Sequence, residues 1–291
     1  MIRVSVLVSL YRCVVYLESF LQHVSNTSQQ GEIEFLLLHN DPLPEEISII
    51  KRYQDGIRGL NHIVIKEREG LYKTWNRGIS MAKGEYITIW NVDDIRFPES
   101  ILLQMQALDN HPEVAMAYGD MYGTDVYGSH SGKLYVHPEF EANRKEFYKS
   151  YLMSCFQMWR KSIHKELGYY DEQFKCVADF DFQIRTALKY SFVKVKEPLG
   201  VYLENLPHKL SSDSVQSLEN NIIYLRYGVY KKLVIPSLFK SLSLYKKNAF
   251  LFFGKWTTNS VKSPFNGFAR ISGALRSLLG MPKYYARLIL K

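Results

Sequence analysis

The sequence predicts an α/β fold in which a mostly parallel sheet is covered by helices on both faces. The main observation is that apolar, strand-like runs alternate with amphipathic segments through the first 120 residues. Repeated strand–helix–strand units produce a parallel sheet. A length of 291 residues is enough for a sizeable core. A composition with 46% hydrophobic and 14% aromatic residues excludes a disordered chain, and 3 cysteines exclude a disulfide scaffold.

The spacing of apolar residues assigns the elements of the first half in order. Val4–Leu10 is a largely apolar run typical of a buried strand, and the next segment places Leu17, Phe20, Leu21 and Val24 on one helical face. Later helices begin near Pro44 and Pro98, because proline is favoured in the first turn. The further strands are predicted at Glu34–Leu38, Asn61–Lys66, Glu85–Asn91 and Val114–Tyr118, and the helices at Val15–Val24, Glu45–Tyr53, Leu71–Met81 and after Pro98.

The pattern loosens after Tyr122, where glycines recur. Helices are expected again near Phe147–Met158 and Asp179–Lys189. Short strands are expected at Phe192–Val195 and Val201–Leu203.

Several common site motifs are absent or incomplete. The dinucleotide fingerprint Gly-x-Gly-x-x-Gly does not occur, so a nicotinamide enzyme has no support. The segment Gly128–Lys133 is one residue too short for a phosphate loop. The eight histidines show no paired spacing of the zinc type.

The run Asn91-Val92-Asp93-Asp94 directly follows the fourth predicted strand. It fits an ordinary turn, where Asp and Asn are common. It also fits a site for a hard cation, because parallel sheets bind ligands beyond the carboxyl ends of their strands. Mg²⁺ or Mn²⁺ takes one or two carboxylates and completes its shell with water and phosphate oxygens.

These pieces together resemble the family 2 glycosyltransferases with the GT-A fold, a Rossmann-like architecture. The resemblance rests on the opening strand and on four further stretches in the family's order, and it covers roughly residues 3–213. The stretches are Asn76–Ile79, Ala82–Ile87, Asn91–Asp94 with Pro98, and Gly168–Glu172 followed by Ala178–Phe182 and Arg185.

The resemblance implies inverting transfer of a sugar from a nucleotide-diphosphate donor to a hydroxyl of a glycan or lipid-linked acceptor, as in surface polysaccharide synthesis. Asp179 matches the family's catalytic base, with Asp181 as the alternative. Helix capping is the structural explanation for Asp179. The implied Mn²⁺ or Mg²⁺ would be bound by Asp93, Asn91 and His208.

The resemblance also implies a set of donor-binding positions. They are Leu10, Tyr11, Asn40, Asp41, Lys73, Asn76 and Asp94. Two departures weaken the match: Asn91 replaces the first aspartate of the metal motif, and Ala178 replaces a glutamate. A catalytically degenerate GT-A-like binding or scaffold protein, and a nucleotidyltransferase, therefore remain as alternatives.

Charge divides the chain unevenly. Of 37 Lys and Arg residues, 13 lie in Asn220–Lys291, which has no Asp or Glu, leaving residues 1–219 with a net charge of −5. We expect a glycosyltransferase domain over 1–214 and a basic, amphipathic helical region over 215–291, including a helix at Ala269–Leu279. Because large apolar residues interleave with lysines, the basic region suits an anionic membrane surface better than nucleic acid, although a helical domain packed on the sheet is the alternative. The expected location is cytoplasmic, peripheral on the inner face of the cytoplasmic membrane.

Overall fold

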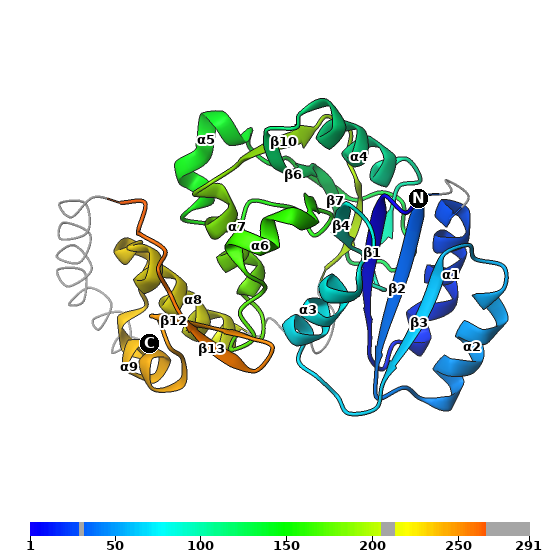
Figure 1. The fold of residues 1–291 in the computed structure, drawn as a ribbon, viewed down its shortest axis with the longest axis horizontal. Coiled ribbons are helices and arrows are strands. Elements are labelled where there is room, and N and C mark those ends of the chain that lie inside the picture. Colours follow the sequence, from blue (N-terminus) through cyan, green and yellow to red (C-terminus); the bar gives the residue numbers. More distant parts are fainter. Residues whose placement is uncertain (29–31, 205–212, 266–291) are drawn as a thin grey trace.

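The computed structural model of the chain describes residues 1–28, 32–204 and 213–265. Its centre is a seven-stranded sheet with the order β10-β6-β9-β4-β1-β2-β3 (Figure 1). Most neighbouring strands are parallel, and β9 alone runs antiparallel, to both β4 and β6. The strands are β1 Val4–Leu10, β2 Ile33–Asn40, β3 Leu60–Ile65, β4 Tyr86–Ile89, β6 Val114–Gly119, β9 Met158–Arg160 and β10 Ser191–Val195.

Helices cover both faces of this sheet, as the sequence predicts. They are α1 Val14–Ser28, α2 Pro44–Gln54, α3 Leu71–Met81, α4 Ser100–Asn110, α5 Phe140–Phe147, α6 His164–Leu167 and α7 Ala178–Ala187, with a 3₁₀ turn at Lys161–Ile163. On one face Val6 and Val8 of β1 pack with α1, α2 and α4, and on the other face Leu7 packs with α3 and α7. A second sheet has the order β5-β11-β7-β8, formed by Ile95–Arg96, Gly200–Leu203, Met121–Thr124 and Lys133–Tyr135.

Gly78 sets how closely α3 lies on the sheet. A Cβ atom built there would stand 2.6 Å from Leu38 Cδ1, closer than real Cβ contacts come, and 3.0 Å from Leu7 Cδ2, which is a tight contact. Glycine therefore lets the helix backbone approach β1 and β2. This approach fixes the position of Tyr72 and Trp75, which α3 carries toward the strand ends.

The predicted helix at Phe147–Met158 is wrong. Only Phe147 belongs to a helix, α5, and the chain then runs irregularly into β9. The side chain of Gln183 binds backbone groups of this segment that would otherwise form helical hydrogen bonds. Its amide oxygen accepts from the N–H groups of Leu152 and Met153, and its amide nitrogen donates to the carbonyl oxygens of Phe147 and Ser150. One buried side chain thus replaces four backbone partners, and the chain can turn back to insert β9 between β4 and β6.

The basic C-terminal region is only partly helical. It contains α8 Asp213–Tyr227, a 3₁₀ turn at Tyr230–Lys232, α9 Ile235–Leu244 and a hairpin of β12 Ala249–Phe252 and β13 Lys255–Thr258 (Figure 1). The expectation of a helical region over 215–291 is therefore wrong for this part of the chain, because Ala249–Phe252 and Lys255–Thr258 pair as antiparallel strands. The helix expected at Ala269–Leu279 lies outside the described residues.

Helix α8 belongs to the same hydrophobic core as the sheet. Ile222, Ile223 and Tyr227 are fully buried with Trp159, of β9, and Phe182, of α7. Within residues 1–28, 32–204 and 213–265, no helix combines the length and apolar character needed to cross a bilayer.

Candidate active site

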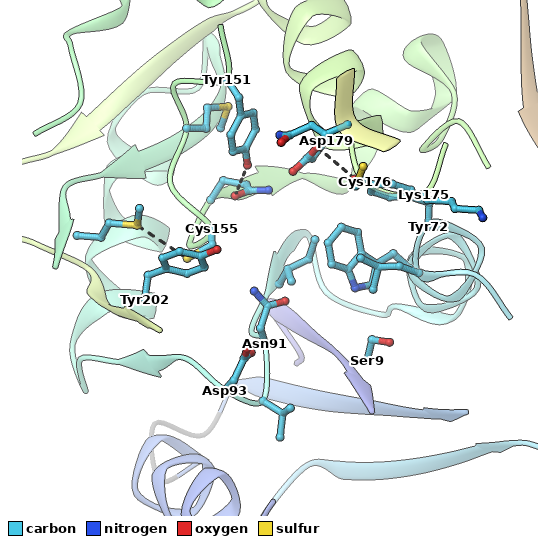
Figure 2. A pocket seen from close by; sticks show the side chains of 18 of the residues that line it. Ser9, Tyr72, Asn91, Asp93, Tyr151, Cys155, Lys175, Cys176, Asp179 and Tyr202 are labelled. Atoms are coloured by element: carbon cyan, nitrogen blue, oxygen red, sulfur yellow. Dashed lines mark hydrogen bonds between the residues drawn. The ribbon is translucent and has the colours of Figure 1, made fainter. Parts of the chain in front are cut away.

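A cavity of about 600 Å³ opens beyond the carboxyl ends of β1 and β4 (Figure 2). Ser9 reaches it from β1, and Asn91 and Asp93 reach it from the loop after β4. In Figure 2, Asp179 and Tyr151 lie on the side opposite Asn91 and Asp93. The other lining residues are Leu71, Tyr72, Trp75, Ile89, Val92, Met121, His137, Met153, Cys155, Gln157, Lys175, Cys176, Tyr202 and Gln216.

Asp94 organises the loop that carries Asp93. Its carboxylate is buried and accepts hydrogen bonds from the Leu203 N–H at 3.1 Å and from the Asn91 amide nitrogen at 2.8 Å. Burial, reinforced by the charge of Asp93, raises the pKa of Asp94 to about 7. Asp94 therefore holds the loop against β11 and does not line the cavity, whereas Asp93 and Asn91 do.

The donor set at Asp93 fits a hard divalent cation. Because the Asn91 amide nitrogen donates to Asp94, the other amide atom, its carbonyl oxygen, is the one left to act as a ligand. Mg²⁺ and Mn²⁺ sites commonly use one or two protein oxygens and take the remaining ligands from water and substrate phosphates. No cluster of three His, Cys, Asp or Glu side chains able to hold a metal occurs in the described ranges, so phosphate oxygens would have to complete the shell. His208, the third predicted ligand, lies outside those ranges.

Asp179 stands at the start of α7 and faces the same cavity. It accepts hydrogen bonds from the Tyr72 hydroxyl at 3.2 Å and from the Phe180 N–H at 2.8 Å. Burial raises the pKa of Asp179 to about 6, and these two hydrogen bonds limit the rise. A carboxylate with a pKa near the working pH is suited to accept a proton and release it again.

Asp181 lies away from the cavity. Its carboxylate is fully buried and accepts from Arg185 Nε at 2.8 Å, Arg226 at 2.6 Å and the Tyr227 hydroxyl at 2.8 Å. Burial opposes its ionisation, but the two guanidinium charges hold the pKa of Asp181 below its usual value. The geometry therefore favours Asp179 over Asp181 as the base, and gives Asp181 the task of joining α7 to α8.

None of the predicted donor-binding residues contributes to the lining of this cavity. Asn40 binds the Thr74 hydroxyl and the Glu69 N–H, while Asn76 binds both backbone groups of Tyr170 and the carboxylate of Glu172. These two amides therefore connect α3 to neighbouring parts of the chain. Lys73 lies 3.4 Å from Glu69, which also pairs with Arg77.

Leu10 and Tyr11, at the end of β1, have different environments. Leu10 is fully buried in the core, whereas the ring of Tyr11 lies against the guanidinium of Arg68 at 3.9 Å from its centroid. Asp41 pairs with Arg12 and is about half exposed. In the run His39-Asn40-Asp41, His39 is committed to Glu46 and His62, so Asp41 is the carboxylate that this run presents at the surface.

Several aromatic side chains line the cavity, and the sequence analysis does not predict this. Tyr72 and Trp75 come from α3, Tyr151 from the segment before β9 and Tyr202 from β11. The indole N–H of Trp75 is buried and has no hydrogen-bond partner among the described residues. The apolar spacing of α3 indicates a core face, and nothing local in the sequence separates a ring in the core from a ring that borders a cavity.

Comparison with known proteins decides the family. The model of the family described as Glycosyl transferase family 2 matches residues 5–168, more than half of the chain. The chain belongs to glycosyl transferase family 2. This membership decides against the nucleotidyltransferase interpretation and confirms the predicted resemblance.

Relatives of this family 2 glycosyltransferase carry similar names. An uncharacterized glycosyltransferase of Methanocaldococcus jannaschii is 28% identical over 209 residues, 70% of this chain and 71% of that protein. A PGL/p-HBAD biosynthesis glycosyltransferase of Mycobacterium tuberculosis is 23% identical over 159 residues, 53% of this chain and 58% of that protein.

A solved structure confirms the GT-A fold. The crystal structure of S. aureus TarS residues 1–349 in complex with UDP-GlcNAc superposes with a TM-score of 0.64 at 18% identity, covering 77% of this chain and 65% of TarS 1–349. The chain thus spans less than two thirds of the TarS fragment and of the mycobacterial relative.

Proposed function

We propose that this glycosyltransferase moves a sugar from a nucleotide-diphosphate donor to a hydroxyl of a glycan or lipid-linked acceptor, with inversion at the anomeric carbon. The observation that carries the proposal is that Asp93 and Asp179 face one cavity of about 600 Å³. The TarS structure in complex with UDP-GlcNAc supports a nucleotide sugar as the donor class.

Asp179 is suited to be the base of this reaction. Its ionised carboxylate accepts the proton of the acceptor hydroxyl as that oxygen attacks the anomeric carbon from the face opposite the diphosphate. The hydrogen bonds from Tyr72 and Phe180 to Oδ1 fix the carboxylate and leave Oδ2 to face the acceptor. A single displacement needs no second carboxylate as a nucleophile, and the described residues lining the cavity include only Asp93 and Asp179 as carboxylates.

Asp93 and Asn91 are the residues that would hold Mn²⁺ or Mg²⁺. When bound, such a cation supplies positive charge that stabilises the departing diphosphate. Lys175 also lines the cavity, but in Figure 2 its ammonium group points away from Asn91 and Asp93.

The C-terminal region supports a second proposal, peripheral binding to an anionic membrane. Helix α9 exposes Phe239, Leu242 and Leu244, with Phe239 83% exposed. Lys231, Lys232 and Lys240 lie on or beside the same helix. Exposed apolar side chains beside lysines suit the headgroup boundary, where each cation adds about 1 kcal/mol. This location would suit a lipid-linked acceptor.

Calorimetry with UDP tests the donor part of the proposal. We expect UDP to bind in the presence of Mn²⁺ and Asp93→Ala to abolish the dependence on Mn²⁺. Asp179→Asn should keep the UDP affinity and lose sugar transfer, as expected of a group that acts in the transition state. Binding that is equal with and without Mn²⁺ in wild type and Asp93→Ala would contradict the metal assignment. Nucleotide-sugar binding without any turnover would favour a degenerate binding protein.

A further inference from the structure

A second, smaller cavity adjoins the first and shares Asp179 with it. It has a volume of about 200 Å³. Tyr151, Cys176 and Gln216 line both cavities, so the two spaces meet at the carboxylate. The smaller cavity extends away from Asp93, which does not line it. A molecule in it would approach Asp179 from the side away from the diphosphate.

Helix α8 forms one wall of this second cavity. Gln216, Asn220 and Tyr224 recur every four residues, which places their side chains on one face of the helix. All three are partly exposed, so the cavity is accessible from solvent. They lie outside residues 5–168, the part of the chain that the family model matches.

The polar groups of this wall are available to a ligand. Across residues 1–28, 32–204 and 213–265, no protein hydrogen bond occupies the side-chain amide of Gln216 or Asn220 or the hydroxyl of Tyr224. This contrasts with the neighbouring Asn221, which is buried and binds Val234, Ser237 and Ser241. One face of α8 is therefore saturated by its packing, and the next face presents donors and acceptors to the cavity.

The shape and chemistry of the lining match one sugar ring. A cavity of about 150 Å³ is known to hold a benzene ring, so the second cavity has room for one six-membered ring. Aromatic faces from Tyr151, Phe180 and Tyr224 offer apolar contact, and the two amides can each donate to and accept from hydroxyl groups. No Lys, Arg, Asp or Glu other than Asp179 lines it in the described chain, so a charged ligand finds no partner.

We propose that the second cavity is the acceptor subsite and that it binds a neutral hexopyranose, held by Gln216 and Asn220 of α8 with one hydroxyl presented to Asp179. The inference rests on the proposed sugar transfer. It assigns acceptor selection to the C-terminal region and leaves donor binding to residues of the sheet edge.

The test measures binding of octyl glucoside, octyl galactoside, octyl mannoside and octyl N-acetylglucosaminide to the full chain in the presence of UDP and Mn²⁺, by saturation-transfer NMR. Gln216→Ala and Asn220→Ala are compared with Gln106→Ala, a matched control because Gln106 is an exposed glutamine on α4, outside both cavities. Each cavity variant should weaken glycoside binding about five- to tenfold, the loss of one or two neutral hydrogen bonds. UDP affinity should not change.

The possible outcomes separate the two proposals. Glycoside binding that the two α8 variants weaken and Gln106→Ala does not would support the subsite. UDP binding with no bound glycoside, or with glycoside binding that the α8 variants leave unchanged, would overturn the subsite and leave the donor proposal standing. Failure of the wild-type protein to bind UDP would instead contradict the proposed function. Retained UDP affinity shows in each variant that the fold has survived.

Discussion

The hydrogen bond from Tyr72 to Asp179 makes the pH dependence of this enzyme a direct test of the base. Burial raises the pKa of Asp179 to about 6, and the Tyr72 hydroxyl, 3.2 Å from Oδ1, is one of the groups that keep it from rising further. Tyr72→Phe removes this hydroxyl and keeps the ring that packs against Trp75 and Tyr170. The pKa of Asp179 should therefore rise in the variant.

The size of the shift follows from the geometry. A hydrogen bond to a charged group contributes about 1.5–3 kcal/mol, and the 3.2 Å separation places this one at the weak end. Since one pKa unit corresponds to about 1.4 kcal/mol, the pKa should rise by about one unit. A general base works in its ionised form, which predominates above the pKa. At pH 6 the ionised fraction should fall from about one half to about one tenth, a roughly fivefold loss, and above pH 8 the two enzymes should converge.

The assay is kcat/KM against pH from 5 to 9, because this ratio reports the pKa of the free enzyme. Tyr170→Phe is the matched control: it removes a buried hydroxyl in the same aromatic cluster that has no partner among the described residues. The acid limb of the kcat/KM profile should move to higher pH in Tyr72→Phe and stay at the wild-type pH in Tyr170→Phe. Superimposable acid limbs in Tyr72→Phe and wild type would refute the assignment of Asp179.

Three further predictions concern stability and membrane binding. Because burial raises the pKa of Asp179 from 3.8 to about 6, its ionised form disfavours folding; this penalty is absent below about pH 4 and complete above about pH 6. Asp179→Asn should therefore stabilise the fold by about 3 kcal/mol at pH 8 and by much less at pH 4, measured by thermal unfolding at both values. Arg226→Met should lower the free energy of unfolding by about 3–5 kcal/mol, because it leaves buried Asp171 without its ion-pair partner and Asp181 with Arg185 alone; a change below 1 kcal/mol in urea unfolding would contradict this. Phe239→Ser should reduce cosedimentation with anionic vesicles at low salt without changing the melting temperature, and an unchanged pellet fraction would argue against the membrane proposal.

The parts of the fold that were predictable are those in which local pattern and tertiary environment agree. β1 and α3 have the predicted bounds, Val4–Leu10 and Leu71–Met81, because a buried parallel strand is a continuous apolar run and an amphipathic helix has a clear period. Phe147–Met158 has helical spacing, but its backbone groups are bound by Gln183, which lies about 30 residues further along the chain. A distant side chain decided this segment, and no local signal could reveal it.

The predicted site residues also fall into two groups, those that line the cavity and those that do not. The sequence indicates Asp93 and Asp179 because each lies next to a recognisable element and matches a family position, and both side chains line the larger cavity. The predicted donor residues Asn40 and Asn76 are polar residues of the right region, but their amides are used to hold neighbouring backbone and side-chain groups. Sequence position locates a residue near a site. It does not say whether the side chain still has a hydrogen-bonding group to offer.

The net charge of the C-terminal region does not show which of its basic residues are exposed, because one of the 13 is part of the core. Arg226 is almost fully buried, pairs with Asp171 at 3.0 Å and Asp181 at 2.6 Å, and donates to backbone oxygens of Lys246, Lys247 and Ala249. It therefore connects α8 and the loop leading into β12 to α7, whose first turn carries Asp179. A chain cut near Ser214 would lose this arginine, which would leave Asp171 buried without its ion-pair partner and Asp181 with Arg185 alone. Loss of vesicle binding after such a cut would report on folding as much as on lipid contact. Exposed residues of α9 such as Phe239, whose side chain takes no part in this network, are the ones whose substitution tests the membrane surface alone.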